Sequence, residues 1–260
     1  MTFATCIVAL FLSAGADAAP PPPPEPPPAT AVPAPPQEQD PRALGLLKKM
    51  SDRLQRAKSL TFKARTTIEA AGPGGVYATF FNQARVAVQR PDRVSAARTG
   101  DLPEFHFAYD GKSMTVYAPG KNQWATTTAP PTIDAMIVAA YEQGNLSFPA
   151  DEVLVADPYA AVTKDLVYAA LFGQAIIAGH KTDHVVLANP GLELQLWLDV
   201  TTALPVEAAV VYVDDPRKPH FYVEYFDWKL DPKLPASTFA LPKPPGAKQV
   251  EFRTAAHAGL

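Results

Sequence analysis

The stretch from Leu192 to Phe226 consists of three strand-like segments separated by short breaks. In the first segment every second residue from Leu192 to Leu198 is leucine, a period typical of a β-strand with one buried face. The segments Val206–Val213 and Phe221–Phe226 follow after breaks that contain proline. This pattern predicts an antiparallel meander. Apolar and aromatic residues on both faces of the later segments favour a curved sheet around an interior.

The composition allows a large core and argues against nucleic-acid binding. The chain has 260 residues, of which 47% are hydrophobic, and a formal net charge of -3. It could therefore hold one large or two small domains, and it carries no basic run that would bind phosphates. Its one cysteine, Cys6, lies in the N-terminal apolar run, so the rest of the chain has no residue for a disulfide.

The first 18 residues resemble a secretory signal peptide. The apolar run Phe3–Leu12 is short for a membrane span, and the small residues Ala16 and Ala18 fit a cleavage site. We expect export with cleavage after Ala18. No Lys or Arg precedes the apolar run, which leaves a weak signal or a start further upstream as alternatives.

A proline-rich linker and an amphipathic helix come next. Residues 19–40 are dominated by proline and alanine, a composition that predicts a disordered, polyproline-like spacer. Pro41 opens a helix that reaches Ala57, with Asp40 as its N-cap. The basic face of this helix would suit a membrane surface. We expect it to pack on a sheet instead.

The remaining pattern is mainly β with an inserted helical block. Helical spacing recurs from Ile133 to Tyr141, and Asp157-Pro158 predicts a second helix through Asp165. The last strand is expected at Gln249–Phe252, followed by a disordered tail at 253–260. The other predicted strands are Leu60–Glu69, Val76–Gln89, Val94–Arg98, Glu104–Tyr109, Ser113–Tyr117, Trp124–Thr126, Val167–Ile177 and His184–Ala188. The order predicts antiparallel β-structure with helices to one side.

The sequence contains none of the common catalytic motifs. It has no nucleophile elbow, P-loop, dinucleotide fingerprint or HExxH. His180 and His184 would lie about 13 Å apart on a strand, too far to share a metal ion. Trp197 and Trp228 could stack on a ligand or pack in the interior. We therefore expect no enzyme activity, no catalytic residue, no metal site and no cofactor.

Several short motifs occur in the order found in a known group of proteins. They are Leu54–Ser59, Val88–Pro91, Tyr109–Lys112, Tyr117–Pro119, Phe239–Pro242 and Pro244–Ala247. Together they resemble the periplasmic outer-membrane lipoprotein carriers, the LolA-like proteins. The chain is still more similar to an uncharacterised exported family, a domain of unknown function thought to share that fold. The residues that carry this second resemblance are Asp157–Tyr159, Gly179, His184, Trp197 and Pro205.

The resemblance implies a LolA-like domain over residues 41–252. Such a domain is a half-open antiparallel β-barrel with a helical lid over an apolar cavity for acyl chains. By its position Arg90 corresponds to an arginine implicated in lid control, and its rigid fork of donors suits hydrogen bonds to backbone carbonyls. The alternative is that Arg90 only caps the turn beside Pro91. The helical insert is longer than in the carriers, and the proline-rich arm is additional.

We expect a non-catalytic, monomeric periplasmic protein that holds an acyl chain, a lipoprotein lipid or a similar apolar ligand. The Ile133–Tyr141 helix would act as its lid. The alternative is an envelope sensing or scaffolding module that binds a protein partner without lipid transport. The residues expected to line the cavity are Leu194, Leu196, Val210, Tyr212, Val223, Tyr225, Ile133, Met136 and Ile137.

Overall fold

The structure is a computed structural model that describes residues 38–71, 76–146, 148 and 151–258. The expected signal peptide and nearly all of the expected linker lie outside these residues. Within them, no helix is long and apolar enough to cross a membrane.

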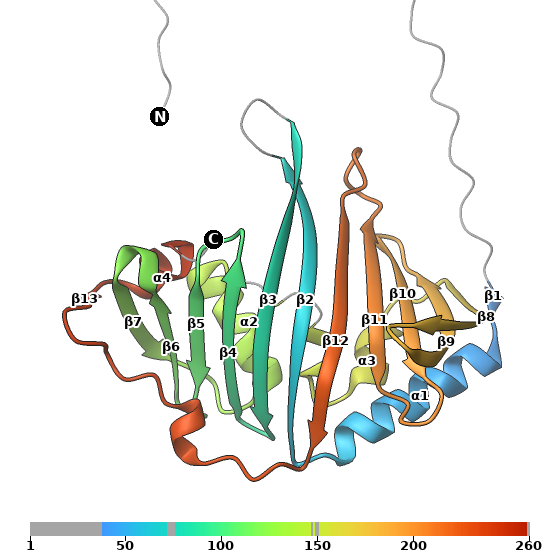
Figure 1. Cartoon of the computed structure of the whole chain (residues 1–260), viewed down its shortest axis with the longest axis horizontal. Coiled ribbons are helices and arrows are strands. Elements are labelled where there is room, and N and C mark those ends of the chain that lie inside the picture. The colour runs from blue at the N-terminus through green and yellow to red at the C-terminus, as the bar shows by residue number, and fades with distance from the viewer. Residues whose placement is uncertain (1–37, 72–75, 147, 149–150, 259–260) are drawn as a thin grey trace, which may run out of the picture. The chain divides into compact units, whose positions relative to one another are not determined.

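The strands form one 13-stranded sheet in the order β1-β8-β9-β10-β11-β12-β2-β3-β4-β5-β6-β7-β13 (Figure 1). They are β1 (Glu38–Gln39), β2 (Ser59–Ala71), β3 (Tyr77–Gln89), β4 (Arg93–Gly100), β5 (Phe105–Tyr109), β6 (Ser113–Ala118), β7 (Gln123–Thr128), β8 (Tyr168–Ile177), β9 (His180–Ala188), β10 (Leu192–Asp199), β11 (Pro205–Tyr212), β12 (His220–Leu230) and β13 (Lys248–Gln249). The mainly β fold class is thereby confirmed. The sheet is open, because its strand order is linear and ends at β1 and β13.

The sequence predicts a wholly antiparallel sheet, but the structure contains two parallel pairs. The two-residue strands β1 and β13 pair in parallel with β8 and β7 at the two edges. β1 precedes all the other strands in the chain, and β13 follows them all. Neither is joined to its partner strand by a hairpin turn. Their direction is therefore set by the path of the chain and not by a hairpin turn.

The predicted meander is present as β10, β11 and β12, and β12 joins the two halves of the sheet. Its residue Phe221 lies opposite Val210 on one side and Ile68 of β2 on the other. Val223 likewise lies between Ala208 and Thr66. A segment near the C-terminus therefore supplies a strand in the middle of the sheet, beside an N-terminal hairpin, and one apolar face runs across both halves.

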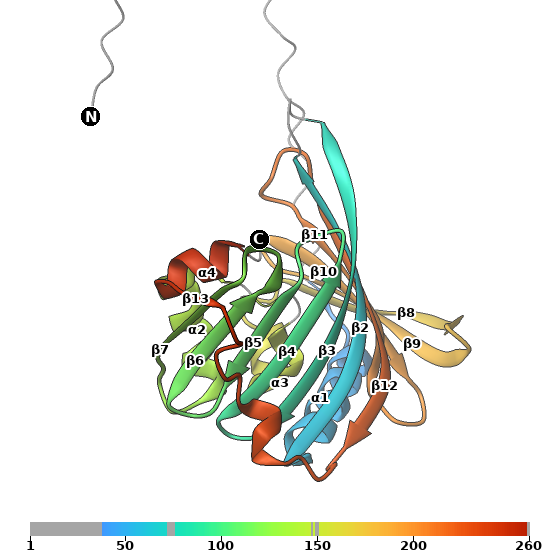
Figure 2. The same ribbon diagram turned by 60° about the vertical axis from the view of Figure 1, so that its left-hand side comes forward.

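Helices α1 to α4 lie on one face of the sheet (Figures 1 and 2). Helix α1 (Pro41–Arg56) begins at Asp40, whose carboxylate accepts from the Arg42 amide. Its residues Leu47, Met50 and Leu54 are fully buried in the common core, so the helix packs on the sheet as expected and its apolar stripe is not available to a membrane. Helix α2 (Ile133–Gly144) and helix α3 (Pro158–Val162) follow β7.

Two helix predictions need correction. Helix α3 ends at Val162 and not at Asp165, because the backbone leaves the helical conformation at Thr163 (ψ 3°) and Asp165 adopts a positive φ of 54°. At the other end of the chain, β13 is shorter than the strand expected at Gln249–Phe252, and Phe252 begins helix α4 (Phe252–Ala258).

A disordered tail is expected from residue 253, but residues 253–258 belong to helix α4. Ala255 and Ala256 are fully buried against the β6–β7 region and α2. Gly144 permits this approach, since a Cβ there would lie 2.8 Å from the Phe252 ring. The spacing of Phe252, Ala255 and Ala256 is helical, but small alanine side chains give a weak apolar signal.

Candidate binding cavity

An apolar cavity of about 130 Å³ lies on the helix-covered face of the sheet. Strands β2 to β5 and β12 form its floor, and residues between α2 and α3 form its cover. A cavity of about 150 Å³ can hold a benzene molecule. The space as it stands therefore admits a ligand of roughly six carbon atoms. Its principal apolar lining residues are Phe62, Ala64, Ile68, Ala84, Val86, Phe105, Phe107, Leu146, Phe148, Leu154, Val223 and Tyr225.

A second cavity of about 20 Å³, the size of one water molecule, adjoins the first. Val223 and Tyr225 of β12 line both cavities. The other lining residues of the small cavity are Met50, Glu152, Val153, Val162, Leu194, Leu196, Ala208, Val210 and Phe221. The two cavities therefore share one wall of the sheet.

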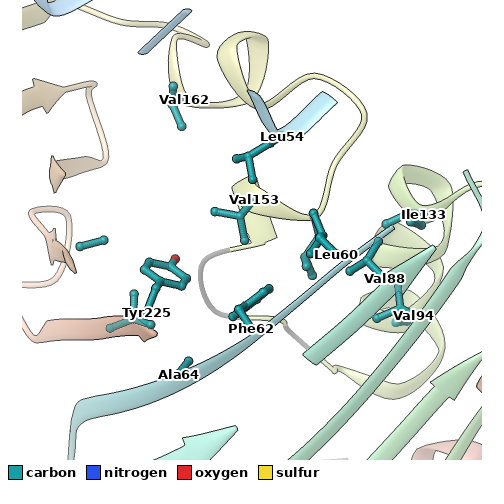
Figure 3. Close-up of a cluster of buried hydrophobic side chains, with 14 of the residues drawn as sticks. Leu54, Leu60, Phe62, Ala64, Val88, Val94, Ile133, Val153, Val162 and Tyr225 are labelled. Carbon is teal, nitrogen blue, oxygen red and sulfur yellow. The ribbon is translucent and has the colours of Figure 1, made fainter. Parts of the chain in front are cut away.

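One short segment contributes to both cavities. Residues 151–155, here called the closing segment, begin with a 3₁₀ turn, Asp151–Val153. Leu154 lines the large cavity, and Glu152 and Val153 line the small one. Figure 3 shows Val153 with Leu54 of α1 on one side and the rings of Phe62 and Tyr225 on the other. Displacing the closing segment would therefore enlarge both spaces.

Arg90, at the end of β3, holds the closing segment through its backbone. Its Nη1 donates to the carbonyl oxygens of Leu154 and Val155, both at 2.7 Å. Its Nη2 lies 3.4 Å from the Val153 carbonyl oxygen. Burial lowers the pKa of Arg90, whereas the nearby Asp134 carboxylate raises it. The guanidinium remains a cation because its ordinary pKa is so high.

Asp134, in the first turn of α2, holds the next residue of the chain. Its carboxylate oxygens accept from the Ala156 amide at 3.2 and 3.3 Å. Arg90 and Asp134 thus bind consecutive parts of the backbone. The hydrogen bonds of Arg90 go to carbonyls, as expected. Those described run to residues 153–155, and none of them runs to the Ile133–Tyr141 helix.

Two carboxyl groups of the closing segment are partly withdrawn from water. Burial raises the pKa of Asp151 and of Glu152, and the Asp151 charge adds to the effect on Glu152. Neither side chain forms a cluster with His or Cys. Among the residues that the structure describes, no group of three or more His, Cys, Asp or Glu side chains could hold a metal ion.

The sequence of the chain identifies its family. Residues 43–253 match the model of a family described as predicted periplasmic protein, DUF2092. The chain belongs to the DUF2092 family. No curated protein matches it.

Solved structures show more distant likeness to this DUF2092 chain. The lipoprotein LppX from Mycobacterium tuberculosis is 14% identical, with 73% of this chain and 96% of that chain covered and a TM-score of 0.46. LprF from Mycobacterium bovis is 15% identical, with 80% of this chain and 99% of that chain covered and a TM-score of 0.44. A LolA superfamily protein from Nitrosomonas europaea is 14% identical, with 76% of this chain and 97% of that chain covered and a TM-score of 0.33.

The DUF2092 domain brings together five of the nine residues expected to line a cavity. Leu194, Leu196 and Val210 line the small cavity, and Val223 and Tyr225 line both. These five alternate along β10, β11 and β12 on the face that the helices cover.

The other four expected residues lie elsewhere. Ile133 and Met136 are fully buried in the core, and Ile137 packs against it, but none of them lines either cavity. Tyr212 is 45% exposed at the end of β11. It has the same alternation as Val210 but is the last residue of its strand. Alternation alone does not show where the covering layer stops.

Sequence reasoning missed the half of the cavity formed by β2 to β5. Phe62, Ala64 and Ile68 alternate along β2 toward the cavity, a signal that was present in the sequence. Phe148 was also missed, although its ring packs edge-on against Phe107 with 4.9 Å between centroids. Trp228 packs inside, with its ring 4.5 Å from that of Phe62. Trp197 stacks on His184 at 4.3 Å.

Proposed function

We propose that this protein is a non-catalytic periplasmic binding protein that holds the acyl chain of a lipid or lipoprotein, or a similar apolar ligand, in a half-open barrel. The observation that carries the proposal is the apolar cavity whose cover, the closing segment, is held by backbone hydrogen bonds from Arg90. These hydrogen bonds can break and reform while the strands of the sheet stay paired. The signal peptide, cleaved after Ala18, and the proline-rich linker at 19–40 belong to the same proposal.

The cavity must enlarge before it can hold a long chain. A C16 chain gains on the order of 10 kcal/mol from burial, at about 0.8 kcal/mol per methylene. Opening would expose Val153 and Leu154, at about 1.5–3 kcal/mol each, and break the Arg90 bonds, at about 1.5–3 kcal/mol each. The free energy gained by burying the chain and the free energy needed to open the closing segment are of the same order. Affinity should therefore rise steeply with chain length, and short chains should fail to bind.

The test is lipid analysis and ligand uptake on protein purified without detergent. Co-purified lipid, or uptake of a fluorescent long-chain fatty acid that shorter chains do not displace, supports the proposal. Absence of both contradicts it. The variant Ala84→Phe places a ring on the cavity wall of β3 and should abolish uptake. Ala87→Phe is the matched control, because Ala87 lies three residues further on the same strand and faces away from the cavity.

A second candidate is a sensing or scaffolding module that binds an envelope protein. It is favoured by the small free volume, since rings of Phe62, Phe105, Phe107 and Tyr225 already project into the cavity. In that case Ala84→Phe would leave the function intact. Protein that carries no lipid, takes up none and is cross-linked in the envelope to the same partner with or without Ala84→Phe would favour this candidate over the first.

A further inference from the structure

The small cavity beside the closing segment contains two polar groups in otherwise apolar walls. Glu152 is the one charged residue among the described residues that line it, and Tyr225 supplies the one hydroxyl group. The remaining lining side chains are aliphatic, aromatic or thioether groups, and no lysine, arginine or histidine is among them. The cavity therefore holds a group that can carry a negative charge and no group that can carry a positive one.

The Tyr225 hydroxyl forms no hydrogen bond within the part of the chain that the structure describes. Tyr225 is only 5% exposed, and its ring centroid lies 5.7 Å from that of Phe62 and 5.7 Å from that of Trp228. In Figure 3 the hydroxyl oxygen points away from β12, to the side on which Val153 lies. A buried hydroxyl without a partner is costly. A ligand atom in the cavity that this ring lines would satisfy it.

The carboxyl group of Glu152 lies at the same small space. Burial raises its pKa most, the Asp151 charge raises it further, and a hydrogen bond from its own backbone amide lowers it. Burial also raises the pKa of Tyr225 well above its usual value, and the charges of Glu152 and Asp151 add to that effect. A cation near both groups would favour the ionised carboxylate, because an opposite charge stabilises it.

The size of the space restricts which cation can enter it. The small cavity measures about 20 Å³, room for one water molecule. A primary ammonium group is similar to water in size, because it is one heavy atom with its hydrogens, and it donates several hydrogen bonds. The adjoining large cavity of about 130 Å³ is mainly apolar, and it shares the walls Val223 and Tyr225 with the small one. One ligand can therefore place a head group in the first space and a carbon chain in the second.

We infer that the ligand is an amphiphile with a primary ammonium head group, which binds between the Glu152 carboxylate and the Tyr225 hydroxyl while its carbon chain lies in the large cavity. This rests on the proposed function and narrows it to a chemical class. The carboxyl group is already withdrawn from water in the folded protein, so binding has to remove water chiefly from the ammonium group. The carboxylate then gains the counter-charge that the cavity walls do not supply.

The experiment compares ligands that share a C16 tail and differ in the head group. Dissociation constants for wild-type protein are measured below the critical micelle concentrations of hexadecylamine, hexadecanol and hexadecyltrimethylammonium. We expect hexadecylamine to bind about 10- to 100-fold more tightly than hexadecanol, the range for a charge-assisted hydrogen bond. The trimethylammonium group carries the same charge, but it has no N–H donor and is too large for the small cavity. It should therefore bind no more tightly than the alcohol.

A short amine separates an amphiphile from a small free amine as the source of the head group. Hexylamine has the same ammonium group but a much smaller apolar surface to bury. It should therefore bind more weakly than hexadecylamine. Equal affinity of the two amines would overturn the amphiphile and assign the site to a small amine.

The variant Glu152→Gln removes the charge and keeps the size of the side chain. It should bring the dissociation constants of hexadecylamine and hexadecanol to within about threefold of each other, because only the charge distinguishes the two head groups strongly. Tyr225→Phe removes one hydrogen-bonding group and should weaken binding of both ligands by about 3- to 10-fold. The matched control is Glu193→Gln, an exposed glutamate of β10 that lines neither cavity, and it should keep the preference for the amine.

Three results would overturn the inference. They are equal binding of hexadecanol and hexadecylamine, equal binding of the trimethylammonium ligand and the primary amine, and a preference for the amine that survives in folded Glu152→Gln. The comparison on wild-type protein decides the question even where a variant does not fold. Binding of hexadecanol without a preference for the amine would refute the head-group site and leave the proposed function standing. If none of the C16 ligands binds, the proposed function itself fails.

Discussion

Replacement of Arg90 by leucine should release the closing segment while leaving the sheet folded. Arg90 is anchored at the end of β3, and its side chain reaches three consecutive carbonyl groups of residues 153–155. Leucine has a similar apolar stem but donates no hydrogen bond. The two short bonds at 2.7 Å are lost, and the carbonyl oxygens can regain partners only by exposure to water.

The magnitude follows from these two bonds. A hydrogen bond to a charged group contributes about 1.5–3 kcal/mol, and the contact at 3.4 Å adds little. Part of the loss is recovered when the freed carbonyls bind water, so we expect the free energy of local opening to fall by about 3 kcal/mol. At about 1.4 kcal/mol per factor of ten, this is roughly a hundredfold increase in the open population.

Hydrogen exchange measures this opening at two amides. The Leu154 amide donates to the Asp151 carbonyl at 2.8 Å, and the Ala156 amide donates to Asp134. Both should exchange about a hundredfold faster in Arg90→Leu, while amides of β10 to β12 keep their protection. The control is Arg93→Leu, a nearby arginine whose carboxylate contact, at 4.0 Å, is with Asp92. Unchanged exchange at Leu154 and Ala156 would refute the role in closure, and an equal loss across the sheet would assign Arg90 to overall stability.

Three further predictions concern stability, measured by urea unfolding. Burial and the opposing Glu224 raise the pKa of Glu207 to about 7 from 4.5, so the folded state holds a proton that the unfolded chain releases between these values. The free energy of unfolding should therefore fall by about 1 kcal/mol as pH rises through this window, allowing for solvent screening, and Glu207→Gln should reduce the dependence. A wild-type stability that is flat with pH would contradict it. Leu54→Ala should cost about 2–5 kcal/mol, because Leu54 of α1 is fully buried, and a cost below 1 kcal/mol would show that α1 packs loosely. Gly100→Ala should cost about 1–3 kcal/mol, because Gly100 has a φ of 145° and no room for a Cβ, whereas Gly45→Ala in the exposed face of α1 should be neutral or stabilising. Equal effects of the two alanines would refute the steric argument.

Local patterns predicted most of the elements because each depends on neighbours in sequence. The alternation from Leu192 to Leu198 follows from the two-residue period of a strand and gave β10 with its buried face. Asp40 and Asp157 cap helices because a short carboxylate side chain can accept from amides two or three residues ahead. The sequence pattern did not predict helix α4, because its buried face consists largely of alanines, whose small side chains give a weak hydrophobic pattern.

The cavity was only half predictable for a related reason. Alternation identifies residues that share a face of one strand, as Val223 and Tyr225 do. It does not identify the strand that lies alongside, because backbone hydrogen bonds are the same for every sequence. The pairing of β12 with β2 joins residues about 150 positions apart, and it brings Phe62 and Ala64 to the wall shared with Tyr225.

The sequence by itself determined the mainly β class, the faces of the central strands, the cap of α1 and the presence of an arginine suited to binding carbonyls. Only the tertiary structure decided which carbonyls Arg90 binds, where the covering layer ends at Tyr212, and that β12 pairs with β2 beside the cavity. The physical reason is range. Period and capping act over a few residues, whereas a cavity and its cover are made by side chains that the chain brings together from segments far apart.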